Sequence, residues 1–199
     1  MRERLAQAYR KLGQSLIQGT SGNISVRDGA GMLISPTRTT PEHITAEAII
    51  ATGLGEPVLG ASSEWGLHAA LYEARPELGA VVHTHCDHCT ALACLGLPLP
   101  AFHYMVLTFG GDDVRCAPYT VFGSPELAAL AVKAMTGRTA CLLANHGMIA
   151  AGPDLEAAVA AAHLLEQLAR QYLLAQAAGL PRVLTPQECR AARERFNFY

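Results

Sequence analysis

The sequence predicts an α/β fold in three layers, with a central, largely antiparallel or mixed sheet between helices. Short apolar runs are typical of buried strands, and longer segments carry helix-start and helix-stop signals. Strands occur both in pairs and next to helices along the chain, which favours helices layered on a mixed sheet. No linker, internal repeat or low-complexity tract divides the 199 residues. We therefore expect a single domain over residues 1–199.

The first elements are predicted to be a helix and a hairpin. Residues 2–18 place Leu5, Tyr9, Leu12 and Leu16 at helical spacing, which predicts an amphipathic helix. Residues 23–27 and 32–35 flank the turn signal Asp28-Gly29.

Three further helix starts are predicted from capping patterns. Thr40-Pro41-Glu42 and Ser124-Pro125-Glu126 each combine a capping hydroxyl, a proline at the first position and an acid in the first turn. A helix is expected from Ser62 or Ser63 to Ala74, where Pro76 stops it.

The second half is predicted to alternate between buried strands and helices. Residues 79–85 and 139–145 are short apolar runs, expected to be strands. Residues 87–95 and 154–178 are expected to be helices, the second ending at Gly179. Residues 102–119 are rich in glycine and β-formers, which indicates strands with loops.

The composition limits the possible partners and the location. A formal net charge of −2 without a basic run gives no reason to expect nucleic acid or a membrane surface. The start of the chain lacks an apolar signal segment, and the six cysteines are interpreted as free thiols, so we expect a cytoplasmic protein. The hydrophobic fraction of 50% favours an oligomer that buries part of it.

Three histidines are candidates for a metal site. His83 and His85 lie two apart on an expected strand, so both side chains leave the same face about 6–7 Å apart and can converge on one ion. His146 ends a second apolar strand before Gly147, and it would supply the third ligand of a catalytic zinc site. From the spacing alone, metal binding and a purely structural role of these histidines are equally supported.

Other histidines and cysteines have weaker signals. His88 is a competing ligand, but it lies on the next helix and is expected to support the site from behind. Residues His43, His68 and His163 are interpreted as packing or surface residues on helices, and His103 as a pocket-lining residue. Cys86-x-x-Cys89 has redox or zinc spacing, but no second pair completes a four-sulfur site, so two small apolar residues on a helix are favoured.

Two polar segments are candidates for binding an anion. Ser62, Ser63 and Glu64 stand at a helix start, where backbone N–H groups attract phosphate while Glu64 points at the metal. The segment 20–23 has an amide and backbone able to cup a phosphate. A capping serine and an ordinary turn are the structural alternatives, and on these residues alone they are favoured.

Taken together and in order, these segments resemble the class II aldolase/adducin family. The residues that carry the resemblance extend over nearly the whole chain: 19–27, 32–37, 62–65, 75–85, 88–90, 103–105, 116–119, 122–123 and 145–147. The resemblance implies a layered α/β/α fold in a cyclic homotetramer, with the active site between neighbouring subunits. It also implies Zn²⁺, or another divalent ion such as Mn²⁺ or Co²⁺, on His83, His85 and His146, with Glu64 as a further ligand.

The resemblance further implies an aldehyde-lyase reaction on a sugar phosphate. A ketose 1-phosphate such as L-fuculose 1-phosphate would be cleaved reversibly to dihydroxyacetone phosphate and an aldehyde through a metal-stabilised enediolate. Glu64 would shuttle the proton at carbon, and Tyr104 would protonate the aldehyde oxygen. Tyr199 could close a neighbour's site. The implied phosphate pocket consists of Gly22, Asn23, Thr37, Ser62 and Ser63.

One departure from the family pattern concerns the substrate. The family has glycine after the position of Thr37, and this chain has Arg38. Its guanidinium could strengthen binding of a phosphate or carboxylate, or fill the cradle and exclude the usual sugar phosphate. A pentulose-phosphate 4-epimerase and a decarboxylase of a keto sugar acid or aromatic acid stay open, and so does a non-catalytic adducin-like scaffold.

Overall fold

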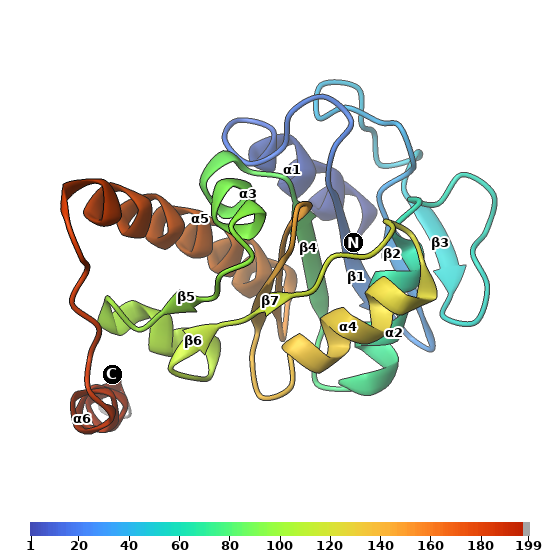
Figure 1. Ribbon diagram of the computed structural model, residues 1–199. Coiled ribbons are helices and arrows are strands. Elements are labelled where there is room, and N and C mark those ends of the chain that lie inside the picture. The colour runs from blue at the N-terminus through green and yellow to red at the C-terminus, as the bar shows by residue number, and fades with distance from the viewer. Residues whose placement is uncertain (197–199) are drawn as a thin grey trace.

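The computed structural model describes residues 1–196, and its centre is a seven-stranded sheet (Figure 1). The strand order is β3-β2-β1-β4-β9-β8-β7, and all neighbours are antiparallel except the parallel pair β7 and β8. Two short strands, β5 and β6, form a separate pair. The strands are β1 Asn23–Asp28, β2 Gly31–Ile34, β3 Ile50–Gly53, β4 Ala80–Thr84, β5 Leu99–Pro100, β6 Asp113–Val114, β7 Cys116–Ala117, β8 Ala140–Leu143 and β9 Gly147–Gly152.

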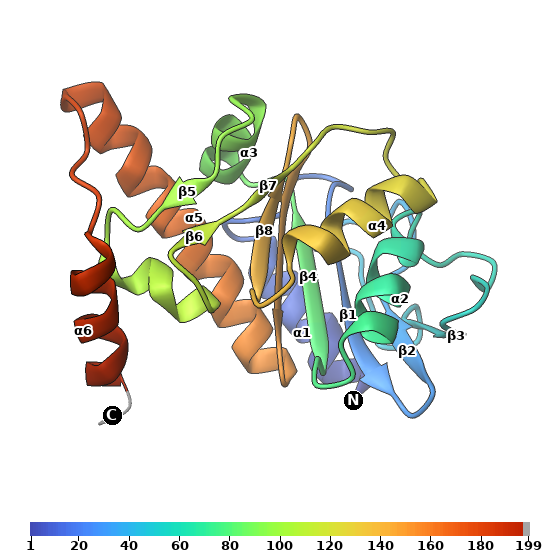
Figure 2. The same ribbon diagram turned by 60° about the horizontal axis from the view of Figure 1, so that its bottom comes forward.

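Helices cover both faces of this sheet (Figures 1 and 2). Helices α1, α3 and α5 pack on one face, and α2 and α4 pack on the other. Strand β4 serves both layers, because Val82 faces the first core and Val81 the second. The helices are α1 Arg2–Leu12, α2 Trp65–Ala74, α3 Asp87–Cys94, α4 Pro125–Ala134, α5 Leu155–Ala178 and α6 Pro186–Phe196, with a 3₁₀ helix η1 at Tyr104–Phe109. The predicted layered α/β fold with a largely antiparallel sheet is confirmed.

The capping pattern at Ser124 locates α4 correctly, and the helix expected over residues 154–178 is present as α5. Leu127 N–H donates to the Ser124 hydroxyl at 3.1 Å, which caps α4. Ala157 N–H donates to the Asp154 carboxylate at 2.8 Å, which caps α5. Both satisfy a backbone donor that the first helical turn leaves unpaired. The predicted hairpin is also present as β1 and β2.

The helix predicted from Thr40-Pro41-Glu42 is wrong, since these residues form only a turn. The Thr40 hydroxyl is paired with His43 Nδ1 at 2.8 Å, and no cap bond from it to a backbone N–H is formed. Pro41 instead packs on the chain after α1, where a Cβ on Gly13 would lie 2.2 Å from Pro41 Cβ. That close approach also fits the end of α1 at Leu12, before the predicted residue 18.

Other differences come from short elements that tertiary contacts stabilise. In the predicted strand-and-loop region 102–119, residues 104–109 form η1, and the short strands β6 and β7 follow it. Strands β3 and β9 and helix α6 were not predicted. Helix α6 packs through Cys189 against Ala101 and Leu107. None of the helices in the described part of the chain combines the length and hydropathy that a membrane crossing needs.

Candidate active site

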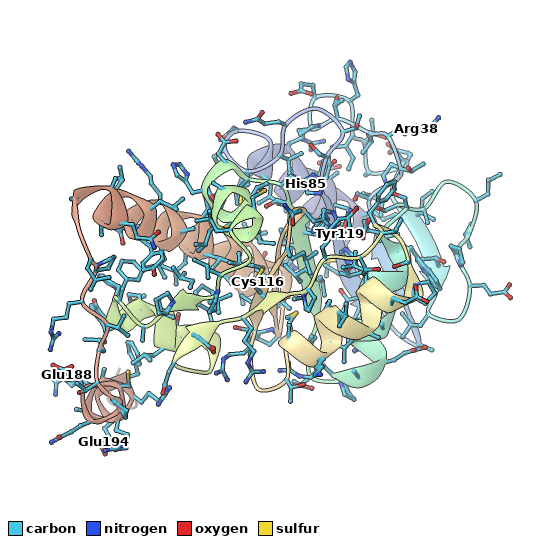
Figure 3. The ribbon with its side chains drawn as sticks, in the orientation of Figure 1. Arg38, His85, Cys116, Tyr119, Glu188 and Glu194 are labelled. Carbon is cyan, nitrogen blue, oxygen red and sulfur yellow. The ribbon has the colours of Figure 1, made fainter. Side chains whose placement is uncertain are left out.

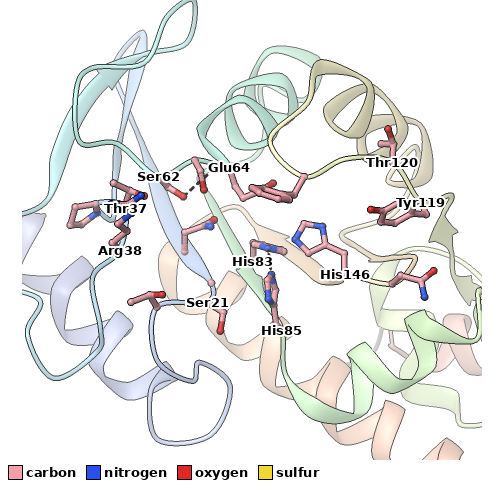
Figure 4. A pocket seen from close by; sticks show the side chains of 17 residues that line it. Ser21, Thr37, Arg38, Ser62, Glu64, His83, His85, Tyr119, Thr120 and His146 are labelled. Carbon is pink, nitrogen blue, oxygen red and sulfur yellow. Dashed lines mark hydrogen bonds between the residues drawn. The ribbon is translucent and has the colours of Figure 1, made fainter.

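One pocket of about 350 Å³ collects most of the predicted site residues (Figure 4). In Figure 4, Thr37 and Arg38 stand on one side, Tyr119 and Thr120 on the other, and the histidines between them. The pocket lies at the ends of β1 and β4, beside the start of α2 and the turn between β8 and β9. It is lined by residues 20–23, 36–38, 62–64, 119–120 and 145–146, and by His83, His85 and Phe122.

The three predicted histidine ligands form a nearly equilateral group. Their ring centroids are 4.8–4.9 Å apart, and their planes cross at 72–74°. Each offers a ring nitrogen within 4.8 Å of the others, and the Nε2 atoms of His83 and His85 are 3.0 Å apart. This arrangement suits three ligands of one tetrahedral ion with a fourth position left for another group.

A backbone hydrogen bond selects the tautomer of His83. Its Nδ1–H donates to the carbonyl of Met148 at 2.9 Å, so the Nε2 lone pair faces the other two rings. Burial, followed by the neighbouring His146 and His85, lowers the pKa of His83 well below its usual value. Burial also lowers the pKa of His85, and it lowers the pKa of His146 to about 4. At neutral pH all three are therefore neutral imidazoles, the form that binds metals.

The turn between β8 and β9 brings His146 to the strand that carries His83 and His85. Gly147 opens β9 beside β4, and a Cβ there would lie only 2.4 Å from the Thr84 carbonyl oxygen. Asn145, just before His146, has a positive φ of 55°, a conformation that asparagine tolerates better than most residues. The glycine and the asparagine thus both allow the close approach that completes the group.

Glu64 supplies a buried carboxylate to the same pocket. It is the N-cap of α2 and only 5% exposed, and its Oε2 has no hydrogen-bond partner among the described residues. Burial raises the pKa of this carboxyl, although a hydrogen bond from the Gly123 backbone opposes the effect. The three neutral imidazoles fit a divalent cation, and the Glu64 carboxylate, with its unpaired oxygen, lines the same pocket without belonging to the group of ligand atoms within 4.8 Å of one another.

The predicted phosphate residues line the other wall. Gly22 has a φ of 115°, and a Cβ there would meet the His83 carbonyl oxygen at 3.0 Å, so glycine is required. The Ser62 hydroxyl accepts the Glu64 N–H at 3.2 Å in the turn before α2 and lines the pocket, but the N-cap of α2 is Glu64, so neither serine is the capping residue. Asn23, Thr37 and Ser63 lie in the same wall, which makes it rich in hydroxyl and amide groups.

The comparisons with known proteins agree with this geometry. Residues 3–173 match the family model described as Class II Aldolase and Adducin N-terminal domain. The chain belongs to this family.

Its relatives include a 5-methylthioribulose-1-phosphate/5-deoxyribulose-1-phosphate aldolase from Rhodospirillum rubrum, 44% identical over 92% of this chain and 85% of that one. An L-fuculose phosphate aldolase from Escherichia coli O6:H1 is also 44% identical, over 92% of this chain and 87% of its own. A solved L-fuculose 1-phosphate aldolase has a TM-score of 0.93 at 38% identity, covering 99% of this chain and 96% of that one. The chain is accordingly a class II aldolase, a metal-dependent lyase by family.

Arg38 distinguishes the pocket of this class II aldolase. It is exposed, lines the pocket and extends to its outer edge (Figures 3 and 4). Its φ of 56° is the only positive value outside glycine, apart from Asn145, in the described part of the chain. Such a conformation costs a non-glycine residue on the order of 1–3 kcal/mol and is most often kept at functional sites. The guanidinium has no hydrogen bond or ion pair to another described residue, so it is available to a ligand.

Tyr104 and His103, both predicted at the site, do not line the pocket of their own chain. Tyr104 begins η1 and stacks on His103, with ring centroids 4.7 Å apart. The Tyr104 ring centroid is 6.0 Å from that of Phe196, the last residue of α6. His103 accepts the Met105 N–H at 3.2 Å and does not line the aldolase pocket. Tyr199 lies outside the described residues.

The remaining histidines separate into different roles. His88 does not join the metal group, because its Nδ1 is paired with Glu166 at 2.7 Å. His43 lies on a turn, and His163 is an exposed residue of α5. His68 is fully buried on α2 and bonded to pocket residue Asn23, which the interpretation as simple packing missed.

Sequence reasoning also missed part of the lining. Tyr119 and Phe122 are 64% and 68% exposed and add two aromatic rings to the lining of the aldolase pocket, where Thr120 lies between them in the sequence. Their signal was their place in the segments 116–119 and 122–123, which carried the family resemblance but received no role. Asn145 gave a signal only as the residue before His146.

Proposed function

We propose that the protein reversibly cleaves a ketose 1-phosphate, such as L-fuculose 1-phosphate, to dihydroxyacetone phosphate and an aldehyde. The observation that carries this proposal is the joining of two unlike surfaces in one pocket. Neutral His83, His85 and His146 with the buried Glu64 form one surface, and a wall of hydroxyl, amide and backbone groups forms the other. One surface suits a metal and the other an anion, at a distance that a small sugar phosphate can span.

The proposed metal is Zn²⁺, with Mn²⁺ or Co²⁺ as the alternatives, held by the three histidines and by Glu64 in the absence of substrate. When bound, such an ion acts as a Lewis acid on the ketose carbonyl. Cleavage breaks the bond between C3 and C4, and C3 must then gain a proton. Glu64 delivers it, since burial raises the pKa of this carboxyl and thereby favours the form that carries a proton.

The C4 hydroxyl must lose its proton as the aldehyde forms, and Tyr104 is the proposed acceptor. The same residue returns the proton in the synthetic direction. Tyr104 is 51% exposed and does not line the pocket of its own chain. We therefore propose a homotetramer in which a neighbouring subunit supplies Tyr104, with Tyr199 closing the same site.

A mixing experiment tests this arrangement. Glu64→Gln and Tyr104→Phe variants are each expected to be nearly inactive, and subunits exchanged between them should regain part of the activity. Recovery occurs because some mixed sites pair an intact Glu64 with an intact neighbouring Tyr104. Absence of recovery after confirmed subunit exchange would place both residues in one chain or remove Tyr104 from the reaction.

A second substrate of the same class is favoured by the aromatic side of the pocket. Tyr119 and Phe122 are exposed and line the pocket, and Figure 4 shows Tyr119 on the side away from Thr37 and Arg38. They offer an apolar surface to the aldehyde end of the sugar, which suits the deoxy or methylthio end of 5-deoxyribulose 1-phosphate or 5-methylthioribulose 1-phosphate. This makes these ketose 1-phosphates the main competitors of L-fuculose 1-phosphate.

A substrate panel decides among the proposed activities. The purified, metal-loaded protein is incubated with the three ketose 1-phosphates, a pentulose phosphate, and keto sugar acids and aromatic acids. Release of triose phosphate supports the aldolase, a C4 epimer supports the epimerase, and CO₂ supports the decarboxylase. Activity on carboxylates alone, lost in Arg38→Gly, would replace the aldolase proposal. A scaffold related to adducin would release no product from any of them.

A further inference from the structure

A chain of buried hydrogen bonds runs behind the polar wall of the pocket. His68 Nε2 is 2.5 Å from Asn23 Oδ1, and His68 Nδ1 is 2.7 Å from the Ser25 hydroxyl. The Ser25 hydroxyl is in turn 2.8 Å from the Tyr72 hydroxyl. All four side chains are at most 4% exposed, and only Asn23 reaches the pocket.

The donor and acceptor in each of these hydrogen bonds follow from the bond between His68 and Asn23. Asn23 Oδ1 carries no hydrogen, so His68 Nε2–H donates to it. A neutral imidazole then has a lone pair on Nδ1, which accepts the Ser25 hydroxyl hydrogen, and Ser25 accepts from Tyr72. Burial lowers the pKa of His68 to about 3, which keeps the ring neutral in the physiological range. With its oxygen held by His68, the Asn23 amide is left with its two N–H groups for the pocket.

The Tyr72 end of this hydrogen-bond network is closed from solvent. The Arg27 guanidinium lies over the Tyr72 ring, 4.7 Å from its centroid, and donates to the backbone carbonyls of Leu78 and Tyr72. Ser25 is on β1 and His68 and Tyr72 are on α2, so the bonds join the strand of Asn23 to the helix that starts at Glu64. Buried and fully paired polar networks of this kind hold their members in one orientation.

We propose that His68 is a positioning residue that turns the Asn23 amide so that its N–H groups donate to the phosphate of the substrate. The inference rests on the proposed function in that the pocket receives a phosphorylated ketose. On this proposal, the N–H groups of Asn23 face the phosphate because of His68, a residue that does not itself contact the substrate. Without His68, the Asn23 amide could flip and present its carbonyl oxygen to the phosphate, which would repel it.

The test compares His68→Leu with His68→Gln in the metal-loaded enzyme. Leucine removes both hydrogen bonds, whereas glutamine offers an N–H to Asn23 and an oxygen to Ser25. Loss of a hydrogen bond to a charged group corresponds to about tenfold or more in binding. His68→Leu should therefore weaken the binding of inorganic phosphate about tenfold by calorimetry and raise KM for the ketose 1-phosphate similarly, with kcat within about threefold.

His68→Gln should restore both constants to within about threefold of the wild type. His163→Leu, an exposed histidine of α5, is the matched control and should change neither. A purely structural role predicts a lower melting temperature for both His68 variants with phosphate binding intact, and that result overturns the proposal. Metal loss in proportion to the rise in KM would also overturn it, because Asn23 is paired with His83 between β1 and β4.

The calorimetric arm keeps this proposal separate from the proposed reaction. A wild type that cleaves no ketose 1-phosphate but binds phosphate in a manner that depends on His68 would refute the reaction and support the positioning role. If the wild type cleaves the substrate and His68→Leu binds phosphate normally, the reaction is supported and the positioning role of His68 is refuted.

Discussion

Two groups of side chains bring metal-ligand atoms within 4.8 Å of one another in the described part of the chain. One is the histidine triad, His83, His85 and His146. The other is the cysteine cluster of Cys86, Cys89 and Glu166, which begins one residue after His85. The triad lines an open pocket, and the cysteine cluster is closed between α3 and α5.

The two groups differ in what their ligand atoms already bind. Glu166 accepts the backbone N–H of His88 at 3.0 Å and that of Cys89 at 2.9 Å. Its carboxylate thus takes the place of a cap at the start of α3, where the helix dipole favours an anion over a cation. Burial raises the pKa of the Cys89 thiol well above its usual value, so the sulfur stays protonated. Proximity of ligand types therefore does not define a metal site, whereas free lone pairs and an open position do.

The largest expected effect is the loss of metal from the triad. Wild-type protein should contain about one ion per chain by elemental analysis, and His83→Ala/His85→Ala should contain almost none, because two of three neutral nitrogen ligands are gone. Lyase activity should fall below detection in that variant.

The matched control is Cys86→Ala/Cys89→Ala, which leaves the triad intact. It should keep the ion and most of the activity. If the cysteine variant loses the metal and the histidine variant keeps it, the comparison between the two groups is reversed.

The next effect concerns the carboxylate beside the triad. Glu64→Gln should lower kcat about 10²- to 10⁴-fold, the usual contribution of a positioned general acid or base. The variant should be at least as stable as the wild type, since glutamine keeps an oxygen for the Gly123 N–H while the desolvation cost of a buried charge is removed. Steady-state kinetics and urea unfolding measure the two parts, and an unchanged kcat would exclude Glu64 from proton transfer.

The carboxylate of the cysteine cluster should give the opposite result. Glu166→Gln keeps the shape of the side chain but faces one backbone N–H with an amide N–H. One unsatisfied donor should reduce the free energy of unfolding by about 1–3 kcal/mol. Its kcat should stay within a few-fold of the wild type, because Glu166 does not reach the pocket. A loss of kcat without a loss of stability would assign Glu166 to the chemistry instead.

The sequence was informative wherever one local pattern decided the outcome. The short apolar run 79–85 predicted a strand on which His83 and His85, two residues apart, share a face, and the capping residue Ser124 marked the start of its helix. It was uninformative where packing against a distant segment decided, as at Pro41, which packs on Gly13 after α1 instead of starting a helix. The partner of His68 could not be predicted, because Asn23 is 45 positions away and the hydrogen bond forms only when α2 packs on the sheet.

The last expected effect is a difference in pH dependence between the two groups, measured on metal-free protein. Histidines of the triad have lowered pKa values in the folded state, so the unfolded chain binds more protons as the pH falls below 6.5. Stability is therefore greatest above pH 6.5 and declines toward pH 4. The fully buried His83 alone contributes a slope of up to about 1.4 kcal/mol per pH unit in this window.

Glu166 also makes the folded state less stable as the pH falls, but it does so at a lower pH than the histidines of the triad. Burial opposes its ionisation, but hydrogen bonds from His88, Cys86 and Cys89 outweigh burial and lower its pKa below 4.5. Its stabilising contribution is present above pH 4.5 and is lost as the pH falls through the folded pKa. Urea unfolding between pH 7.5 and 5 should thus give Glu166→Gln the wild-type slope and His83→Ala/His85→Ala a shallower one. Equal slopes in all three proteins would show that the triad is not held neutral, which removes the physical basis for its choice as the metal site.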